Sequence, residues 1–149
     1  MTNTWRRRSL IEYVNHRLAT KDYFIGYYIE IDGFKKVNDT KGHNAGDKLI
    51  QEVAEKLKEI EDFDVVSRVV GDEFITILNA TNEEEVQKYL QKIKQTIHDI
   101  NASKAFDFDV SFSVGGALFN ESFKSFDDFI EHIDQLMYQD KESKMKKAF

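Results

Sequence analysis

The chain has 149 residues and no cysteine, with 21 Lys+Arg against 27 Asp+Glu and a formal net charge of −6. The length is that of one domain able to bury a core without disulfides, and the lack of cysteine excludes a disulfide framework, a thiolate metal site and a cysteine nucleophile. The acidic balance disfavours nucleic acid as a partner. No run approaches the roughly 18–20 apolar residues of a membrane span, so we expect one cytoplasmic domain over residues 1–149 with no membrane insertion.

The first half of the chain alternates helix and strand patterns. Apolar residues at helical spacing predict a helix over residues 5–19, and the aromatic and β-branched run 23–31 predicts a buried strand. A short helix is expected over 33–39 and a turn over 41–44. A longer amphipathic helix follows and ends near Ile60.

A β-hairpin pattern lies in the middle of the chain. β-Branched runs at 64–70 and 73–78 flank the dipeptide Gly71-Asp72. Glycine and aspartate between two such runs are typical of a two-residue hairpin turn.

The second half continues with a helix, a strand and a helix. Thr81 with Glu84 three residues later predicts a capping box that opens the first helix. Apolar residues alternate strictly with polar residues over 106–114, which predicts a strand. Ser125 and Asp128 have the spacing of a cap that opens the last helix.

The predicted order of elements is therefore α-β-α-α-β-β-α-β-α. Helices interleave with strands, but one pair of strands is an antiparallel hairpin. This combination favours a two-layer α+β fold with a mixed central sheet and flanking helices over a doubly wound parallel fold.

Acidic residues gather where two predicted strands end. Glu30 and Asp32 close the first strand, and Asp72 and Glu73 occupy the hairpin. Mg²⁺ prefers hard oxygen ligands and usually takes one or two carboxylates together with substrate phosphates, so the spacing suits a magnesium site. Acids in turns and on solvent-facing strand positions are also common, and from spacing alone that second interpretation is favoured.

The segment after the first strand has groups that could bind a nucleotide. Gly33 precedes a short helix, whose first backbone N–H groups could hold phosphate oxygens. Asn38, Asp39 and Asp47 offer the donors and acceptors that a base edge needs. The alternative for Asn38 and Asp39 is a structural role in capping or turn formation.

Several separate strings together resemble the GGDEF domains of the diguanylate cyclase family. Residues 30–47, EIDGFKKVNDTKGHNAGD, resemble the nucleotide-binding segment, and residues 70–74, VGDEF, resemble the hairpin that names the family. Ser-Val-Gly at 113–115 and the stretch 138–141 fall where the family places its later motifs. The similarity extends over about residues 10–144 in consistent order and spacing.

The resemblance implies a palm-like fold akin to that of nucleotide cyclases, with GTP as ligand and Mg²⁺ or Mn²⁺ as cofactor. Active members join two GTP molecules into cyclic di-GMP across a homodimer. The 3′-hydroxyl of each GTP attacks the α-phosphate of the other, so that positioning and charge neutralisation supply most of the rate.

The resemblance also implies roles for individual residues. The implied metal ligands are Glu30, the Ile31 carbonyl and Asp72. The implied substrate contacts are the amides of Gly33 and Phe34 for phosphate, Asn38 and Asp47 for guanine, Gly71 in the hairpin, and Lys141 for the terminal phosphate. Asp72 and Glu73 are the implied catalytic residues, with Glu73 beside the reacting hydroxyl.

The chain departs from the family pattern in four places. Glu30 stands at a metal position where aspartate is usual, and Val70 replaces the first glycine of the hairpin motif. Met145 falls where a phosphate-binding arginine is common. In the inhibitory Arg-x-x-Asp motif, Glu61 takes the arginine place ahead of Asp64, so we expect no product-inhibition site.

Three functions are compatible with these residues. The first is a degenerate GGDEF domain that binds GTP weakly or acts as a regulatory module, and the departures favour it. The second is an active diguanylate cyclase, and the third is an interaction scaffold that binds no nucleotide. By the habit of the family, we expect the chain to be a piece of a longer signalling protein with an attached sensor or phosphodiesterase domain.

Overall fold

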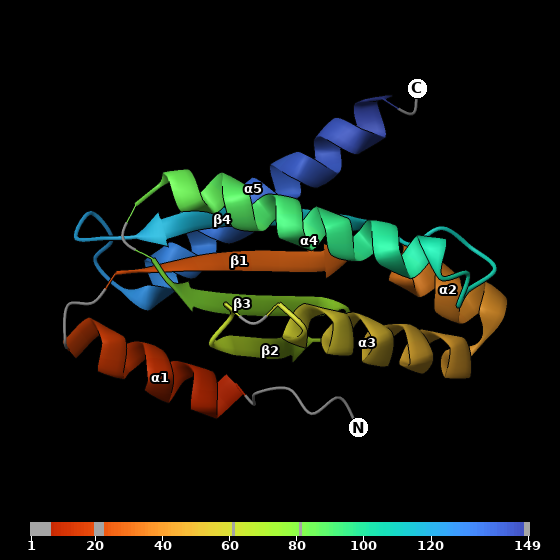
Figure 1. Cartoon of the computed structure of the whole chain (residues 1–149), viewed down its shortest axis with the longest axis horizontal. Helices are drawn as coiled ribbons and strands as arrows, with labels where there is room; N and C mark the ends of the chain where they lie inside the picture. The colour runs from red at the N-terminus through yellow and green to blue at the C-terminus, as the bar shows by residue number, and fades with distance from the viewer. Residues whose placement is uncertain (1–6, 20–22, 61, 81, 148–149) are drawn as a thin grey trace.

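The computed structural model describes residues 7–19, 23–60, 62–80 and 82–147 and contains five helices around one sheet (Figure 1). The helices are α1 (Arg7–Ala19), α2 (Phe34–Lys41), α3 (His43–Lys58), α4 (Glu84–Ala102) and α5 (Phe126–Lys147). The strands are β1 (Phe24–Ile31), β2 (Val65–Val70), β3 (Glu73–Asn79) and β4 (Phe112–Phe119). Within the described residues, no helix combines the length and the apolar composition needed to cross a membrane.

The four strands are arranged in the order β2-β3-β1-β4, with all three neighbouring pairs antiparallel. β1 is central, and its two partners come from distant parts of the sequence. Its residues FIGYYIEI are buried at every position except the seventh. This explains why the strand is a continuous apolar and aromatic run rather than an alternating one.

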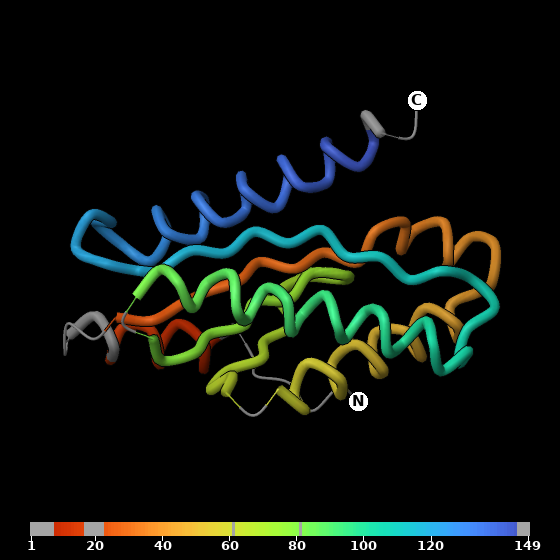
Figure 2. The backbone as a smooth tube through the Cα atoms, turned by 45° about the horizontal axis from the view of Figure 1, so that its top comes forward, coloured from red at the N-terminus to blue at the C-terminus, as the bar shows by residue number. Residues whose placement is uncertain are grey.

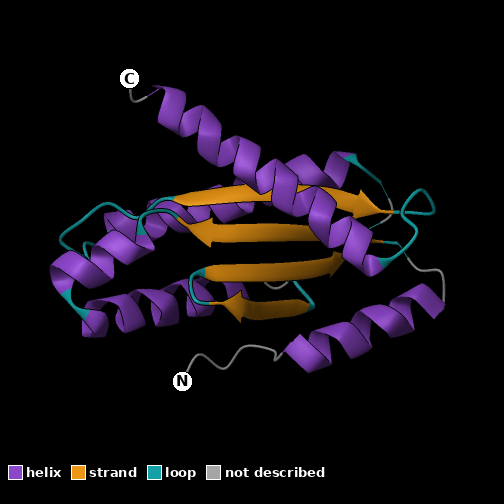
Figure 3. Cartoon of the chain, turned by 180° about the vertical axis from the view of Figure 1, so that it is seen from behind, coloured by secondary structure: helices purple, strands orange, loops and turns teal. Residues whose placement is uncertain are grey.

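Helices cover both faces of the sheet, and each face has its own hydrophobic core. α3 and α4 pack on one face around Tyr27 and Phe74, and α1 and α5 pack on the other around Phe24 and Phe129. Figure 2 shows α4 and α5 on opposite sides of the strands. Seen from behind, α5 crosses the strands diagonally (Figure 3).

The predicted order of elements and the α+β class are confirmed. Two details differ from the expectation. The three strand pairings are all antiparallel where a mixed sheet was expected. Helices on both faces also make three layers rather than two.

The strand predicted over 106–114 begins only at Phe112, so the prediction was wrong over residues 106–111. β1 ends at Ile31, which pairs with Phe112, and the preceding residues therefore have no neighbouring strand. Asn101 holds them instead, because its side chain donates to the Val110 carbonyl (2.9 Å) and accepts from the Val110 N–H (2.8 Å). Alternating apolar residues bury side chains here without forming a strand.

Helix boundaries follow local chemistry closely. The Ser125 hydroxyl accepts from the Asp128 N–H at 3.1 Å, as its spacing predicted. The predicted capping residue Thr81 lies outside the described residues, and the Asn82 side chain accepts from the Glu85 N–H at 3.2 Å. The expected turn at 41–44 is shorter, because α3 already begins at His43 after Gly42 with φ of 91°.

Gly115 lets α5 lie directly on β4. A Cβ atom at this position would overlap the Ile133 carbonyl oxygen and the Met137 nitrogen, which are backbone atoms of α5. Backbone cannot turn aside as a side chain can, so any larger residue has to push the helix off the sheet.

We expect Gly115→Ala to lower the free energy of unfolding by about 2–3 kcal/mol because it overpacks this contact. Gly26→Ala is the matched comparison, since its Cβ would meet the ring edge of Phe129 at 2.7 Å, a side-chain contact in place of a backbone contact. Urea unfolding of both variants measures the difference. A Gly115→Ala variant as stable as the wild type would mean that α5 does not depend on the absence of a side chain at Gly115.

Candidate active site at the strand ends

The register of β1 with β3 gathers three carboxylates at one end of the sheet. Glu30 lies directly opposite Glu73. The Ile31 N–H donates to the Asp72 carbonyl at 3.0 Å, which extends the pairing into the hairpin turn. The two acidic clusters of the sequence are therefore neighbours in space.

The hairpin turn is built by Gly71 and a bulge. Val70 pairs with Glu73, so the loop has two residues, and Gly71 takes φ of 45°, a left-handed value that glycine adopts readily. A register shift lies between Arg68 and Val70, and the Arg68 Nε donates to the Gly71 carbonyl at 2.7 Å. Such a bulge re-aims the end of a strand. It leaves Val70 62% exposed.

The environment of the hairpin acids disfavours their charged forms. Burial raises the pKa of Asp72, and the Glu30 charge raises it further. Burial also raises the pKa of Glu73, together with the charges of Asp72 and Glu30, although a hydrogen bond from Tyr28 works against the rise. That bond, from the Tyr28 hydroxyl to Glu73 Oε2, is 2.6 Å long. Partly desolvated acids that repel one another are typical of cation and catalytic sites.

α5 brings a cation to this cluster. The Lys141 Nζ lies 2.7 Å from Glu30 Oε1, and the Glu30 side chain is only 14% exposed. This hydrogen bond raises the pKa of Lys141, so the ammonium is firmly charged. Met145, one turn further along α5, is 57% exposed. Lys141 is thus hydrogen-bonded to one of the three carboxylates, and the charges of Lys141 and Arg68 both lower the pKa of Asp72 against the effect of burial.

Asp32 forms a second network beside the first, although the sequence grouped it with Glu30 in the candidate magnesium cluster. Its carboxylate accepts from Ser113 Oγ (2.6 Å), Ser111 Oγ (2.8 Å) and Lys144 Nζ (3.1 Å), and Lys144 also donates to the Phe112 carbonyl. Burial would raise the pKa of Asp32, but these hydrogen bonds outweigh it and hold the pKa below its ordinary value. Glu30 and Asp32 are two residues apart, as are Ser111 and Ser113. This period-2 spacing is the sequence pattern from which their position on one face of the sheet could have been predicted.

α2 and α3 carry the residues expected to contact the nucleotide. Gly33, with φ of 66°, starts α2 directly after β1. The Asn38 side chain and the Phe34 ring lie against Gly46, where a Cβ atom would overlap the Asn38 Oδ1. Asp47 follows Gly46 and is exposed. The packing thus brings Asn38 and the start of α3 together beside the end of β1.

The donor set suits a metal ion shared with a bound phosphate rather than one held by protein alone. Among the residues that the structure describes, no three histidine, cysteine or carboxylate side chains are grouped closely enough to hold a metal. One or two carboxylates with substrate phosphates are the usual ligands of Mg²⁺. Glu30 and Asp72 fit that pattern.

Comparison with known proteins gives the family. The model of the family described as "Diguanylate cyclase, GGDEF domain" matches residues 1–147. The chain belongs to the GGDEF domain family.

The relatives of this GGDEF domain include cyclases that are much longer. Diguanylate cyclase DosC of Escherichia coli is 32% identical over 113 residues, which are 74% of this chain and 24% of DosC. Diguanylate cyclase A of Treponema denticola is 32% identical over 119 residues, 77% of this chain and 32% of that protein. The chain therefore spans about a quarter to a third of the length of these relatives.

Solved structures show the same fold. The diguanylate cyclase SiaD of Pseudomonas aeruginosa, crystallised with its activator SiaC, superposes with a TM-score of 0.85 at 23% identity. The match covers 95% of this chain and 56% of the SiaD chain. The expected palm-like GGDEF architecture is thus confirmed.

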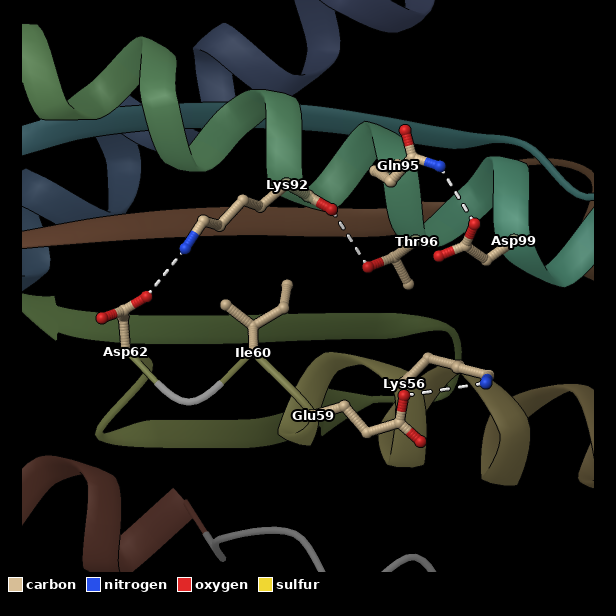
Figure 4. Close-up of a pocket in the computed structure, with 8 residues that line it drawn as sticks. All are labelled: Lys56, Glu59, Ile60, Asp62, Lys92, Gln95, Thr96 and Asp99. Atoms are coloured by element: carbon tan, nitrogen blue, oxygen red, sulfur yellow. Dashed lines mark hydrogen bonds and ion pairs between the residues drawn. The ribbon is translucent and has the colours of Figure 1, made fainter.

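A hollow of about 370 Å³ lies between α3 and α4 of the GGDEF domain, away from the strand-end acids (Figure 4). Its lining holds two ion pairs, Lys92 with Asp62 at 2.9 Å and Lys56 with Glu59 at 3.6 Å, and the Asp99 carboxylate accepts from the Gln95 amide at 3.0 Å. Glu61, the residue expected to preclude product inhibition, lies outside the described residues. Asp64 Oδ2 accepts from the Asn79 N–H at 3.2 Å.

We expect Glu73→Gln to raise the free energy of unfolding at pH 7 by about 0.2–1 kcal/mol, the cost of like charges directly opposite in a sheet. Glutamine keeps an acceptor for Tyr28 and removes the repulsion from Glu30. Because the folded-state pKa of Glu73 is raised, the wild type binds more protons when folded, and its stability falls as pH rises through that range.

The gain should therefore vanish below the ordinary glutamate pKa of about 4.3. Urea unfolding at several pH values measures it, with Glu131→Gln on the exposed side of α5 as the control. A gain that is equal at all pH values would contradict the like-charge explanation.

Proposed function

We propose that this chain is a GTP-binding GGDEF domain of cyclic di-GMP signalling that works chiefly as a regulatory module and turns over little GTP. The observation that carries the proposal is the convergence of Glu30, Asp72 and Glu73 with Lys141 beside the start of α2. Carboxylates for a shared cation, a lysine for phosphate and helix-start amides are the parts that nucleotide binding with Mg²⁺ requires.

Different residues would bind the phosphates and the base of GTP. Glu30, the Ile31 carbonyl and Asp72 would hold Mg²⁺ or Mn²⁺, which when bound neutralises phosphate charge. The amides of Gly33 and Phe34 would hold phosphate oxygens, and Lys141 would bind the terminal phosphate.

The base would lie on the other side of α2. Asn38 and Asp47 would hydrogen-bond the guanine, Asp47 as an acceptor of two N–H groups and Asn38 as both donor and acceptor. Gly71 would leave room for the nucleotide at the hairpin, and Glu73 would lie beside the 3′-hydroxyl and hold its proton.

The existing ion pair supports weak rather than efficient use of this site. Lys141 is bound to Glu30, so a metal at Glu30 and a phosphate at Lys141 both have to displace the same 2.7 Å contact. The longer glutamate also suits the strict octahedral geometry of Mg²⁺ less well than aspartate. Val70 and Met145 add exposed apolar side chains where the family has a glycine and an arginine.

An active diguanylate cyclase is the second candidate. The intact pair Asp72-Glu73, with the pKa of both carboxyls raised by burial, favours it. Cyclic di-GMP formation would require two copies of the domain to face one another, each with one GTP. The dimer, an attached sensor or phosphodiesterase domain, and action in the cytoplasm, where GTP is available, are parts of the same proposal.

We expect a non-hydrolysable GTP analogue with Mn²⁺ to bind weakly in calorimetry, with affinity reduced about tenfold or more in Asp72→Ala because one charge-assisted contact is about 1.5–3 kcal/mol. Asp99→Ala, which removes a carboxylate of the hollow between α3 and α4, is the matched control and should bind as the wild type does. Incubation with GTP and Mn²⁺ should yield little cyclic di-GMP.

Two outcomes would replace the proposal. The absence of heat at millimolar ligand would favour a scaffold without nucleotide. Rapid synthesis of cyclic di-GMP that is abolished in Asp72→Ala would establish the active cyclase.

We expect Val70→Gly to tighten binding of the GTP analogue several-fold, because it removes an exposed side chain beside the hairpin acids. The same titration measures it, and urea unfolding of the variant checks that β2 tolerates glycine. Unchanged or weaker binding by a folded variant would show that the valine side chain does not obstruct the nucleotide.

A further inference from the structure

β4 is an edge strand, and only one of its two sides is paired. In the sheet order β2-β3-β1-β4 its single neighbour is β1. Figure 1 shows α4 on the near side of β4, and Figure 3 shows α5 on the opposite side. The second side of the strand therefore faces the space between two helices.

Hydrogen bonds to α5 reveal which residues of β4 point their backbone groups outward. The Val114 N–H donates to Asp140 Oδ2 at 2.9 Å, and the Phe112 carbonyl accepts from Lys144. In an antiparallel pair, outward and inward residues alternate along the strand. Gly116 and Leu118 must therefore also point their N–H and C=O groups away from β1.

The outward groups divide into a capped half and an open half. Asp140 and Lys144 satisfy those of Val114 and Phe112, because the last turns of α5 lie beside that part of the edge. Gly116 and Leu118 instead line a hollow of about 480 Å³. Within the described part of the chain, no side chain hydrogen-bonds to the backbone of either residue.

The walls of this hollow are fixed in place. The Tyr27 hydroxyl donates to the Val86 carbonyl at 2.5 Å and ties the first turn of α4 over the sheet. The Tyr27 ring packs against Gly116, where a Cβ atom would overlap it, so this part of the sheet is held closely beneath α4. Val86 from α4 and Leu136 from α5 give the two walls an apolar surface.

The chemistry of the hollow selects its occupant. Unpaired N–H and C=O groups at every second residue match an extended backbone, which adds to a sheet edge as a further strand. Glu83 is the one carboxylate among the lining residues, which include no lysine or arginine. Charge complementarity therefore favours a basic partner.

We infer that the β4 edge between α4 and α5 binds an extended, basic peptide segment of a partner protein as an additional strand. The site is separate from the strand-end acids and does not depend on nucleotide binding. Its recognition is twofold, with backbone pairing at Gly116 and Leu118 and a lysine or arginine beside Glu83.

Amide hydrogen exchange, followed residue by residue by NMR, tests the inference. In the free protein, the amides of Gly116 and Leu118 should exchange faster than those of Gly115 and Ala117, which pair with β1. A short acetylated peptide that alternates lysine with valine is the probe. Saturation with it should slow exchange at Gly116 and Leu118 by about tenfold or more and leave Gly115 and Ala117 unchanged.

Two controls separate strand addition from simple charge attraction. A fully N-methylated peptide with the same side chains has no backbone donors and should give no protection. Glu83→Gln should weaken binding of the unmodified peptide several-fold, whereas Glu84→Gln makes the same change of charge one residue away, outside the lining, and should not.

Three results would overturn the inference. The first is unchanged exchange at Gly116 and Leu118 with millimolar peptide, and the second is equal binding of the N-methylated peptide. The third is protection that rises with protein concentration in the absence of peptide, which would identify a second copy of this chain as the occupant.

Discussion

The pairing of β1 with β3 forces like charges together, and the strand-end site is organised around that constraint. Main-chain hydrogen bonds fix Glu30 opposite Glu73 and bring Asp72 alongside, despite the repulsion between the three carboxylates. Burial, and after it the repulsion between these carboxylates, raises the pKa of Asp72 and Glu73. A purely structural sheet end gains nothing from such repulsion, whereas a site that receives a cation with its ligand does.

Asp32 differs from the hairpin acids because the structure supplies it with hydrogen-bond donors and a lysine. It lies two residues from Glu30 on the same strand face, yet two serine hydroxyls and Lys144 satisfy its carboxylate, and its pKa is lowered. Glu30 has one lysine for a cluster of three acids. The contrast assigns Asp32 to holding the structure and leaves the hairpin acids available for a ligand.

Local chemistry was enough to predict the elements but not their partners. Periodicity and turn residues gave the order of all nine elements, and the strings around Glu30 and Asp72 gave the family. The strand predicted over 106–114 was wrong over 106–111, because alternation indicates which side chains are buried and does not indicate where the neighbouring strand ends. The contact of Lys144 with Asp32 depends on the path of α5 over β4, which no local pattern encodes.

That path links the site to the edge of the sheet. Gly115 admits the backbone of α5 onto β4, and the helix then runs diagonally across the strand, so that its last turns come to lie beside the edge (Figure 3). From there Lys141 and Lys144 reach the acids, while Asp140 and Lys144 also cap the backbone of Val114 and Phe112. The angle between α5 and β4 thus determines which lysines reach the strand-end acids and how much of the β4 edge stays open. A helix parallel to β4 would lie equally close to both ends of the strand and could not cap one end while leaving the other open. A displacement of α5 would therefore change the strand-end acids and the β4 edge together.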